Sequence, residues 1–326
     1  MSTEATNPPS TIERPRRSLP HALVVLARPH QWSKSVFVLL GPLYGLRDLM
    51  AHGKTVSQVL LDGVFAAGAF ALASSACYVV NDLLDAEADR SHPRKKFRPI
   101  ARGEVPTGVA WAYSLALIAA SLLMVLLLPA TVRWTVALTL VVYIANVFAY
   151  SYVLKHRPIA DVMSLSLGFV LRMFGGCAAV AIAPSTWLLN TTLFFSMFLA
   201  FGKRLGERRT MGELGLDASV ARGVQARYTD DLLRMMVVVT AVATLLTYAS
   251  YVQSKDVQFT RAILGLTSGF NLLWLTTIPA TYAILRSIVL LETGKHDDPT
   301  EIMMRDTPML LSVLAFAGIT GAVVVL

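Results

Sequence analysis

Long apolar segments are the feature that most constrains the fold of this chain. About 20 apolar residues in a helix cross the hydrocarbon core of a bilayer, and lipid-exposed backbone must satisfy its own hydrogen bonds. We expect spans at residues 36–50, 56–80, 107–128, 132–153, 161–183, 186–201, 232–252, 268–290 and 309–325. The sequence therefore predicts an all-α, polytopic membrane protein of about nine transmembrane helices.

Composition excludes an ordinary soluble domain. The 326 residues are 55% hydrophobic and 15% charged, with a mean hydropathy of +0.56. The net charge of +8 is interpreted as a topology signal, and no nucleic-acid partner is expected. The cysteines Cys77 and Cys177 lie in apolar spans, so we expect small core residues and no disulfide.

The two ends of the chain differ in character. Residues 1–20 are rich in Pro, Ser and Thr and are expected to form a disordered cytosolic tail, because no apolar signal-peptide core follows them. Residues 21–326 are expected to form one helical domain. Near its start, RPHQWSKS fits a short amphipathic segment at the membrane surface, with Trp32 at the interface and Lys34 on the aqueous side.

The distribution of Lys and Arg predicts the orientation. With the N-terminus inside, 23 of the 29 Lys and Arg residues fall in inside segments and five in outside loops, while Arg172 lies within a span. Inside loops of membrane proteins carry this excess. We therefore expect a cytosolic N-terminus, an outside C-terminus and a multi-pass location in the cytoplasmic membrane.

The run from Asn81 to Gly103 carries the strongest candidate chemistry. It reads NDLLDAEADRSHPRKKFRPIARG. In a helix, which turns about 100° per residue, Asp82, Asp85 and Asp89 would share one face. Like charges repel there, so we expect a cation among them, and carboxylate oxygens suit Mg²⁺ bound with substrate phosphates. The alternative is a solvated loop. Cations follow and would hold remaining phosphate charge: Arg90, Arg94, Lys95, Lys96, Arg98 and Arg102.

Three more polar segments are expected on the cytosolic side, where they would meet the first at one mouth. The segment 203–231 begins with a basic cluster, part of which the positive-inside pattern explains: Lys203, Arg204, Glu207, Arg208 and Arg209. A second segment opens the span 161–183 with Lys155, Arg157 and Asp161. A third holds Asp297, Asp298 and Asp306, of which the adjacent pair favours a helix start over a metal site.

Arg172 stands apart, because it lies about eleven residues into the span 161–183. A charged side chain at that depth is costly and indicates a functional cavity. Its neighbours Gly168, Gly175 and Gly176 would allow helices to approach closely.

The pattern N-D-x-x-D-x-x-x-D followed by H-P-x-x-K-x-R-P-I-x-x-G resembles the first aspartate motif of the UbiA-type intramembrane prenyltransferase superfamily. Asn81, Asp82, Asp85, Asp89 and the basic tail to Gly103 match it, as do RPHQWSK and the nine-span layout. The resemblance implies a helical bundle around a central cavity with a cytosolic mouth, and Mg²⁺ on this motif. One departure stands out: the family's second aspartate motif, D-x-x-x-D, is replaced by KRLGERR.

In this departure the chain resembles the branch of the superfamily that transfers a phosphoribosyl group. The resemblance implies transfer of the 5-phosphoribosyl group from phosphoribosyl diphosphate to a polyprenyl (decaprenyl) monophosphate, with release of diphosphate, in arabinan precursor synthesis for actinobacterial cell walls. It assigns catalysis and Mg²⁺ to Asp82, Asp85 and Asp89. It assigns donor binding to Asn81, Lys96, Arg98, Lys203, Arg204, Glu207 and Arg208, and the lipid phosphate to Lys34, Lys155 and Arg172.

Two other functions stay open. An aromatic or haem prenyltransferase of the same superfamily would need a second carboxylate motif, and no clear D-x-x-x-D is present. A secondary transporter would show internal inverted repeats, and none is clear in the sequence. The partners expected are the two substrates and the bilayer, and a homo-oligomer is compatible with the sequence.

Overall fold

The computed structural model describes residues 16–91, 95–213, 227–261, 269–293 and 306–325. Its helices, with 3-10 helices marked η, are α1 (Leu19–Ala27), η1 (Pro29–Ser35), α2 (Val36–Tyr44), α3 (Leu46–Ala51), α4 (Val56–Leu84), α5 (Ala86–Ser91), η2 (Lys95–Phe97), α6 (Thr107–Leu126), α7 (Ala130–Tyr152), η3 (Leu154–His156), α8 (Ala160–Ala179), α9 (Thr186–Glu213), α10 (Asp230–Ser254), α11 (Asp256–Phe259), η6 (Leu272–Thr276), α12 (Thr277–Glu292) and α14 (Thr307–Val325). Two short strands, β1 (Thr260–Arg261) and β2 (Phe270–Asn271), pair antiparallel. The expected tail lies outside the described residues up to residue 15, and its last two residues begin α1.

The fold is that of an all-helical, multi-pass membrane protein, as the sequence predicted. Seven helices of the described chain are long and apolar enough to cross a membrane: α4, α6, α7, α8, α10, η6 with α12, and α14. The remaining expected spans fall on shorter or more polar elements. Residues 36–50 form α2 and α3, which meet at Gly45, and residues 186–201 form the apolar first part of α9.

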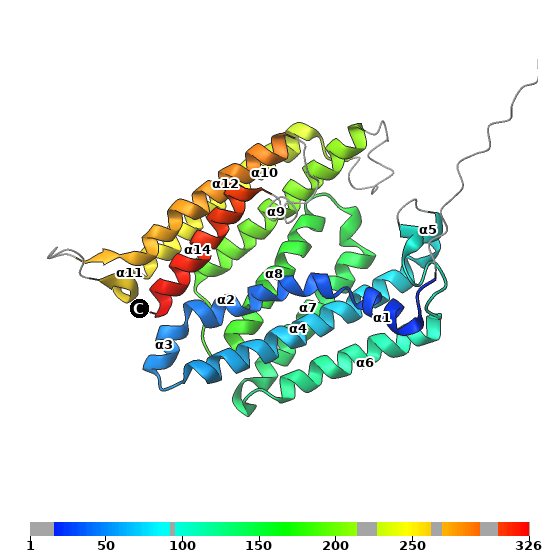
Figure 1. The fold of residues 1–326 in the computed structure, drawn as a ribbon, viewed down its shortest axis with the longest axis horizontal. Helices are drawn as coiled ribbons and strands as arrows, with labels where there is room; N and C mark the ends of the chain where they lie inside the picture. Colours follow the sequence, from blue (N-terminus) through cyan, green and yellow to red (C-terminus); the bar gives the residue numbers. More distant parts are fainter. Residues whose placement is uncertain (1–15, 92–94, 214–226, 262–268, 294–305, 326) are drawn as a thin grey trace, which may run out of the picture.

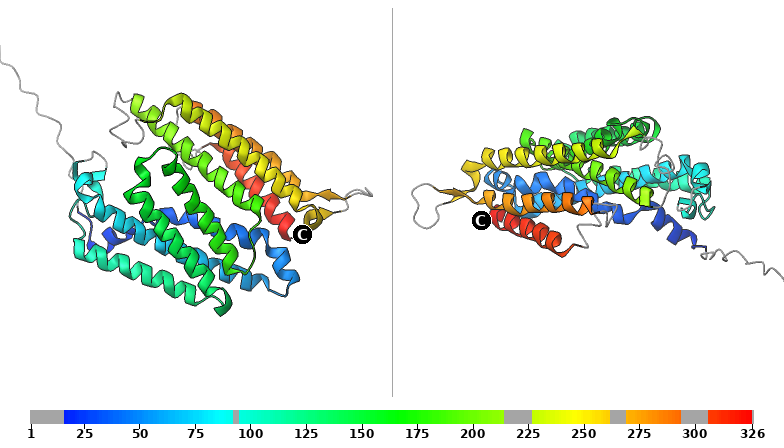
Figure 2. Two further views of the ribbon diagram at one scale, coloured as in Figure 1. Left: turned by 180° about the vertical axis from the view of Figure 1, so that it is seen from behind. Right: turned by 90° about the horizontal axis from the view of Figure 1, so that it is seen from above.

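The helices lie side by side in an elongated bundle (Figures 1 and 2). In Figure 1, α9, α10, α12 and α14 run along one side and α4 and α6 along the other, with α2, α7 and α8 between them. Helix α8 contacts α2, α4, α7 and α9. It therefore occupies the centre of the bundle, and both ends of α8 are placed by several neighbours.

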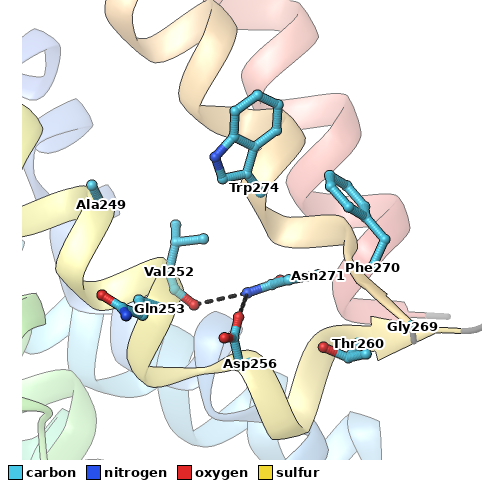
Figure 3. Close-up of a pocket in the computed structure, with 9 residues that line it drawn as sticks. All are labelled: Ala249, Val252, Gln253, Asp256, Thr260, Gly269, Phe270, Asn271 and Trp274. Carbon is cyan, nitrogen blue, oxygen red and sulfur yellow. Dashed lines mark hydrogen bonds between the residues drawn. The ribbon is translucent and has the colours of Figure 1, made fainter.

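A cavity of about 410 Å³ lies at the end of the bundle that carries the β1–β2 hairpin (Figure 3). The Asn271 side-chain amide donates to the carbonyl oxygen of Val252 at 2.9 Å and to Asp256 Oδ1 at 2.5 Å. These bonds join the start of η6 to the end of α10 and the start of α11. The polar groups at the floor of this cavity therefore serve the local fold.

Candidate active site

The polar segments singled out in the sequence lie at the end of the bundle opposite the hairpin (Figure 1). Helix α4 ends there and leads into α5, and η3 leads into α8. Ion pairs join these segments to one another, as described below. The structure thus brings together the Asp-rich run, the turn before α8 and the basic end of α9.

The helix carrying the aspartates is interrupted but keeps its direction. Helix α4 ends at Leu84 and α5 begins at Ala86, with Asp85 between them. The amide of Asp85 still donates to Asn81 O at 3.0 Å, and the amide of Asp89 donates to Asp85 O at 2.8 Å. The helical spacing predicted for the three aspartates is therefore retained through the break.

Asp82 and Asp89 converge on one cation. Both are buried, at 2% and 3% exposed. Nη1 of Arg98 lies 3.0 Å from Asp82 Oδ1 and 2.7 Å from Asp89 Oδ2. A buried carboxylate needs such a partner, because its charge has lost its water. The two side chains thus form a site in which a positive centre sits between carboxylate oxygens.

Asp82 has a second cationic partner that the sequence reasoning did not assign. Nη2 of Arg28 lies 2.6 Å from Asp82 Oδ1, and its guanidinium lies 4.8 Å from the centre of the Tyr78 ring. Arg28 links α1 to η1 and has a left-handed backbone, with φ of 53°. The available signal was its place in RPHQWSKS, the segment in which Lys34 was assigned to the lipid phosphate and Arg28 was given no role.

The third aspartate faces another segment. Asp85 Oδ1 lies 3.4 Å from Nζ of Lys155, and both side chains are partly exposed. Within the described chain, no three His, Cys, Asp or Glu side chains gather as a metal site. Asp82 and Asp89 nevertheless fit Mg²⁺, which takes one or two protein carboxylates and completes its shell with phosphates and water. Asp85 as a further ligand stays a prediction.

The other residues predicted to act near this motif lie on neighbouring elements. Asn81 is in the last turn of α4, and Lys34 is near the end of η1; both are partly exposed. Lys96 is exposed on η2, with its Nζ 5.4 Å from the centre of the Phe97 ring. Asn81 directly precedes Asp82, and Lys34 and Lys96 lie on the short helices that adjoin Arg28 and Arg98, the two partners of Asp82.

The basic end of α9 is tied to the start of α8. Arg204 is 2% exposed, and its Nε lies 3.1 Å from Asp161 Oδ2. Nη1 of Arg204 lies 3.4 Å from Glu207 Oε2, while Nη2 is buried without a partner among the described residues. Arg208 pairs with Asp230 at 2.5 Å, and Lys203 is partly exposed.

Tyr228 completes this contact, and the sequence reasoning missed it. Its hydroxyl donates to Asp161 Oδ1 at 2.8 Å and accepts from the amide of Ile159 at 2.6 Å. Burial, together with the hydrogen bond to Asp161, raises the pKa of Tyr228 above its ordinary value. The hydroxyl therefore stays protonated and remains a donor to the carboxylate.

Arg172 lies inside the bundle at 5% exposed. It donates to Tyr143 Oη at 2.5 Å, to Ser74 Oγ at 3.3 Å and to Gly168 O at 3.3 Å. Its guanidinium also packs 4.6 Å from the centre of the Tyr143 ring. Among the described residues these partners are neutral, so the positive charge is not balanced by an adjacent carboxylate.

Asp306, the described member of the last acidic segment, starts a helix. Its Oδ1 accepts from the amide of Met309 at 3.0 Å, and its carboxylate pairs with Arg286 at 2.8 Å. A side chain that accepts a hydrogen bond from the backbone amide three residues further along the chain caps the N-terminus of a helix. Asp297 and Asp298 lie outside the described residues.

Comparison with known proteins identifies the class. The UbiA prenyltransferase family model matches residues 39–314. A decaprenyl-phosphate phosphoribosyltransferase of Mycolicibacterium smegmatis is 34% identical and aligns over 95% of this chain and 94% of its own length. The protein of the same name from Corynebacterium glutamicum is 34% identical, over 94% of this chain and 87% of its own length. The chain belongs to the UbiA prenyltransferase family and is a membrane-embedded transferase of that superfamily.

The fold agrees with solved members. A UbiA homologue from Archaeoglobus fulgidus, solved with GPP and Mg²⁺, superposes with a TM-score of 0.65 at 16% identity. The match covers 94% of this chain and all of that one. At this identity the comparison establishes the shared architecture.

Proposed function

We propose that this protein transfers the 5-phosphoribosyl group of phosphoribosyl diphosphate to a polyprenyl monophosphate such as decaprenyl phosphate, releasing diphosphate. The observation that carries the proposal is the run KRLGERR in α9, where Lys203, Arg204 and Arg208 stand with one carboxylate, Glu207, in place of a second aspartate motif. The names of relatives that are 34% identical over most of the chain support it. In an actinobacterium, this product would serve arabinan precursor synthesis for the cell wall.

The donor carries charge at two ends, and the residues offer two kinds of partner. We assign its diphosphate end to Asp82, Asp85 and Asp89 with Mg²⁺, joined by Asn81, Lys96 and Arg98. The chemistry that Mg²⁺ supplies there when bound is neutralisation of charge on the leaving diphosphate. We assign the 5-phosphate to the end of α9, where Lys203, Arg204 and Arg208 would bind it directly as cations and Glu207 would hold Arg204 in place, at 3.4 Å.

Arg28 and Arg98 have a defined part in this proposal. Both guanidinium groups contact Asp82, at 2.6 and 3.0 Å. With Mg²⁺ held by Asp82 and Asp89, the guanidinium groups of Arg28 and Arg98 would donate to the phosphates of the bound donor. Each charge-assisted hydrogen bond to a phosphate contributes about 1.5–3 kcal/mol.

The acceptor phosphate needs cations but no strong base. A phosphate monoester is already ionised at neutral pH, since its second pKa is about 6. We assign it to Lys34, Lys155 and Arg172, which screen repulsion between acceptor and donor. Holding the ionised oxygen in line with the anomeric carbon converts the reaction to an effectively unimolecular step. Attack opposite the departing diphosphate inverts that carbon.

Purified protein should release diphosphate when both phosphoribosyl diphosphate and a polyprenyl phosphate are present, and EDTA should stop the release. The labelled ribose phosphate should move into the organic phase. The comparison reaction contains a polyprenyl diphosphate and an aromatic acceptor. Turnover of that second pair with none of the first would assign the chain to prenyl transfer, and lack of any Mg²⁺-dependent diphosphate release would favour a transporter.

A further inference from the structure

We propose that Asp161 and Tyr228 are positioning residues for the transfer reaction, because they hold the turn that carries Lys155 against the basic end of α9. This inference rests on the proposed function, in which Lys155 serves the acceptor phosphate and Arg204 the donor phosphate. It adds two residues that contact neither substrate and act through those that do.

The contact joins three elements at one buried point. Asp161 lies in the first turn of α8, Arg204 lies on α9, and Tyr228 lies two residues before the start of α10. The three side chains are 0%, 2% and 1% exposed. Asp161 uses one oxygen for Arg204 and the other for Tyr228, so a single carboxylate fixes both neighbours.

The turn before α8 has a backbone that needs such support. Ile159 has φ of 67° and ψ of −48°, and the amide of Ala160 donates to Pro158 O at 2.7 Å. This is a γ-turn of the rare form, which is strained, and a β-branched residue is a poor occupant of it. Such conformations persist where surrounding contacts determine them. The Tyr228 hydroxyl, 2.6 Å from the Ile159 amide, is a contact of this kind.

Lys155 lies four residues before Ile159, on the short helix η3 between α7 and α8. The amide of Arg157 donates to Leu154 O at 3.0 Å and the amide of Asp161 donates to Arg157 O at 3.1 Å, so hydrogen bonds join η3 across the γ-turn to the first turn of α8. Lys155 reaches Asp85 from this turn, at 3.4 Å. The Tyr228 hydroxyl therefore sets where Lys155 stands relative to the aspartate motif.

Arg204 is oriented by the same carboxylate. Asp161 holds Nε, Glu207 holds Nη1, and Nη2 is buried without a partner among the residues described. A guanidinium with two nitrogens fixed presents the third in one direction. Loss of the Asp161 charge should therefore affect the donor side, in addition to the acceptor side.

Tyr228→Phe removes only the hydroxyl, and Tyr248→Phe is its matched control. The Tyr248 hydroxyl is buried and lies 2.5 Å from Thr276 Oγ1, away from the aspartate motif. We expect Tyr228→Phe to raise the acceptor KM about tenfold and the donor KM less than about twofold, because misplaced binding groups lose affinity and rate. Asp161→Asn should raise both KM values. Tyr248→Phe should keep both within about twofold at a similar melting temperature.

A double-mutant cycle separates positioning from general stability. If Tyr228 acts through Lys155, Tyr228→Phe should lower kcat/KM for the acceptor much less in a Lys155→Met background than in the wild type. Fully additive effects, or equal KM changes in Tyr228→Phe and Tyr248→Phe, would overturn the proposal. If the wild type turns over only a prenyl diphosphate and its acceptor, the proposed function fails, while the same cycle on that pair still tests the positioning role.

Discussion

At the scale of single residues, the candidate active site depends on how buried charges are paired. Asp82 is 2% exposed and accepts from Arg28 and Arg98, each of which is about a quarter exposed or less. Removing one member of such a set leaves the others without full compensation. The pairing with Arg28 and Arg98 offsets the charge that the buried Asp82 carboxylate carries when it is ionised.

Asp82→Asn should abolish Mg²⁺-dependent turnover while the protein remains folded, since the change is nearly isosteric and Arg98 keeps Asp89. Each charge-assisted hydrogen bond that is lost should lower the free energy of unfolding by at most about 1.5–3 kcal/mol. Asp62→Asn is the control on the same helix, because Asp62 pairs with Lys54 at 3.8 Å at the other end of α4. Diphosphate release and Mg²⁺ titration calorimetry measure the two effects, and wild-type turnover in Asp82→Asn would exclude the metal assignment.

Arg172→Met should separate stability from activity. The buried guanidinium has neutral partners, so replacing it by an apolar side chain of similar length removes a costly charge. We expect a melting temperature in detergent equal to or above that of the wild type. If the cation screens the lipid phosphate, the acceptor KM should rise about tenfold, which corresponds to about 1.4 kcal/mol. An unchanged KM would make Arg172 a structural residue.

At the scale of helices, the centre of the bundle depends on close contact between α2 and α8. A Cβ on Gly176 would lie 1.7 Å from the carbonyl oxygen of Val38, and one on Gly175 would lie 2.4 Å from the Phe70 ring. Close helix approach was predicted at Gly168, Gly175 and Gly176, and the structure confirms it at the last two; a Cβ on Gly168 would meet its nearest neighbours at an ordinary 3.7 Å. Because α8 also carries Asp161 and Arg172, its packing against α2 affects the positions of both side chains.

Gly176→Ala should destabilise the protein by about 1–3 kcal/mol or more, because the blocking atom belongs to a backbone that cannot rotate away. Gly321→Ala is the matched control in α14, where an added Cβ meets nothing within 4 Å. Thermal unfolding in one detergent compares the two variants. Equal melting temperatures would contradict the close α2–α8 contact.

At the scale of the whole molecule, the segments that carry the candidate site gather at one end of the bundle. The aspartate motif, η3 and the basic end of α9 share one end, while α11 and the β1–β2 hairpin occupy the other (Figure 1). The Lys and Arg bias predicts that the first end faces the cytosol. This orientation would place the candidate site where a soluble donor reaches it.

Single cysteines test that orientation. Glu87 is exposed on α5, and Val257 is 99% exposed on α11. In intact cells, Val257→Cys should react with an impermeant thiol reagent, and Glu87→Cys should react only after the membrane is opened. The native cysteines are buried, so background labelling should be low. Labelling of Glu87→Cys from outside would reverse the predicted topology.

The sequence by itself determined the membrane class, most of the spans and the aspartate motif. Each of these depends on residues close together in the chain: apolar runs long enough to cross a bilayer, and carboxylates three and four residues apart on one helix. Local spacing predicted one shared face for Asp82, Asp85 and Asp89; in the structure Asp82 and Asp89 meet at Arg98, whereas Asp85 pairs with Lys155. Local spacing did not predict the paired strands β1 and β2, and β2 (Phe270–Asn271) occupies the start of the expected span 268–290.

Only the tertiary structure decided which charges meet. Arg28 reaches Asp82 across 54 residues, and Tyr228 reaches Asp161 across 67. Arg204 was predicted from its sequence neighbours to bind a phosphate, which stays a prediction, and the fold pairs its Nε with Asp161. Which side chains meet across such sequence separations depends on how the helices pack against one another. Because an unpaired buried charge is costly, packing favours arrangements in which each buried charge has a partner, and no local sequence pattern encodes those pairs.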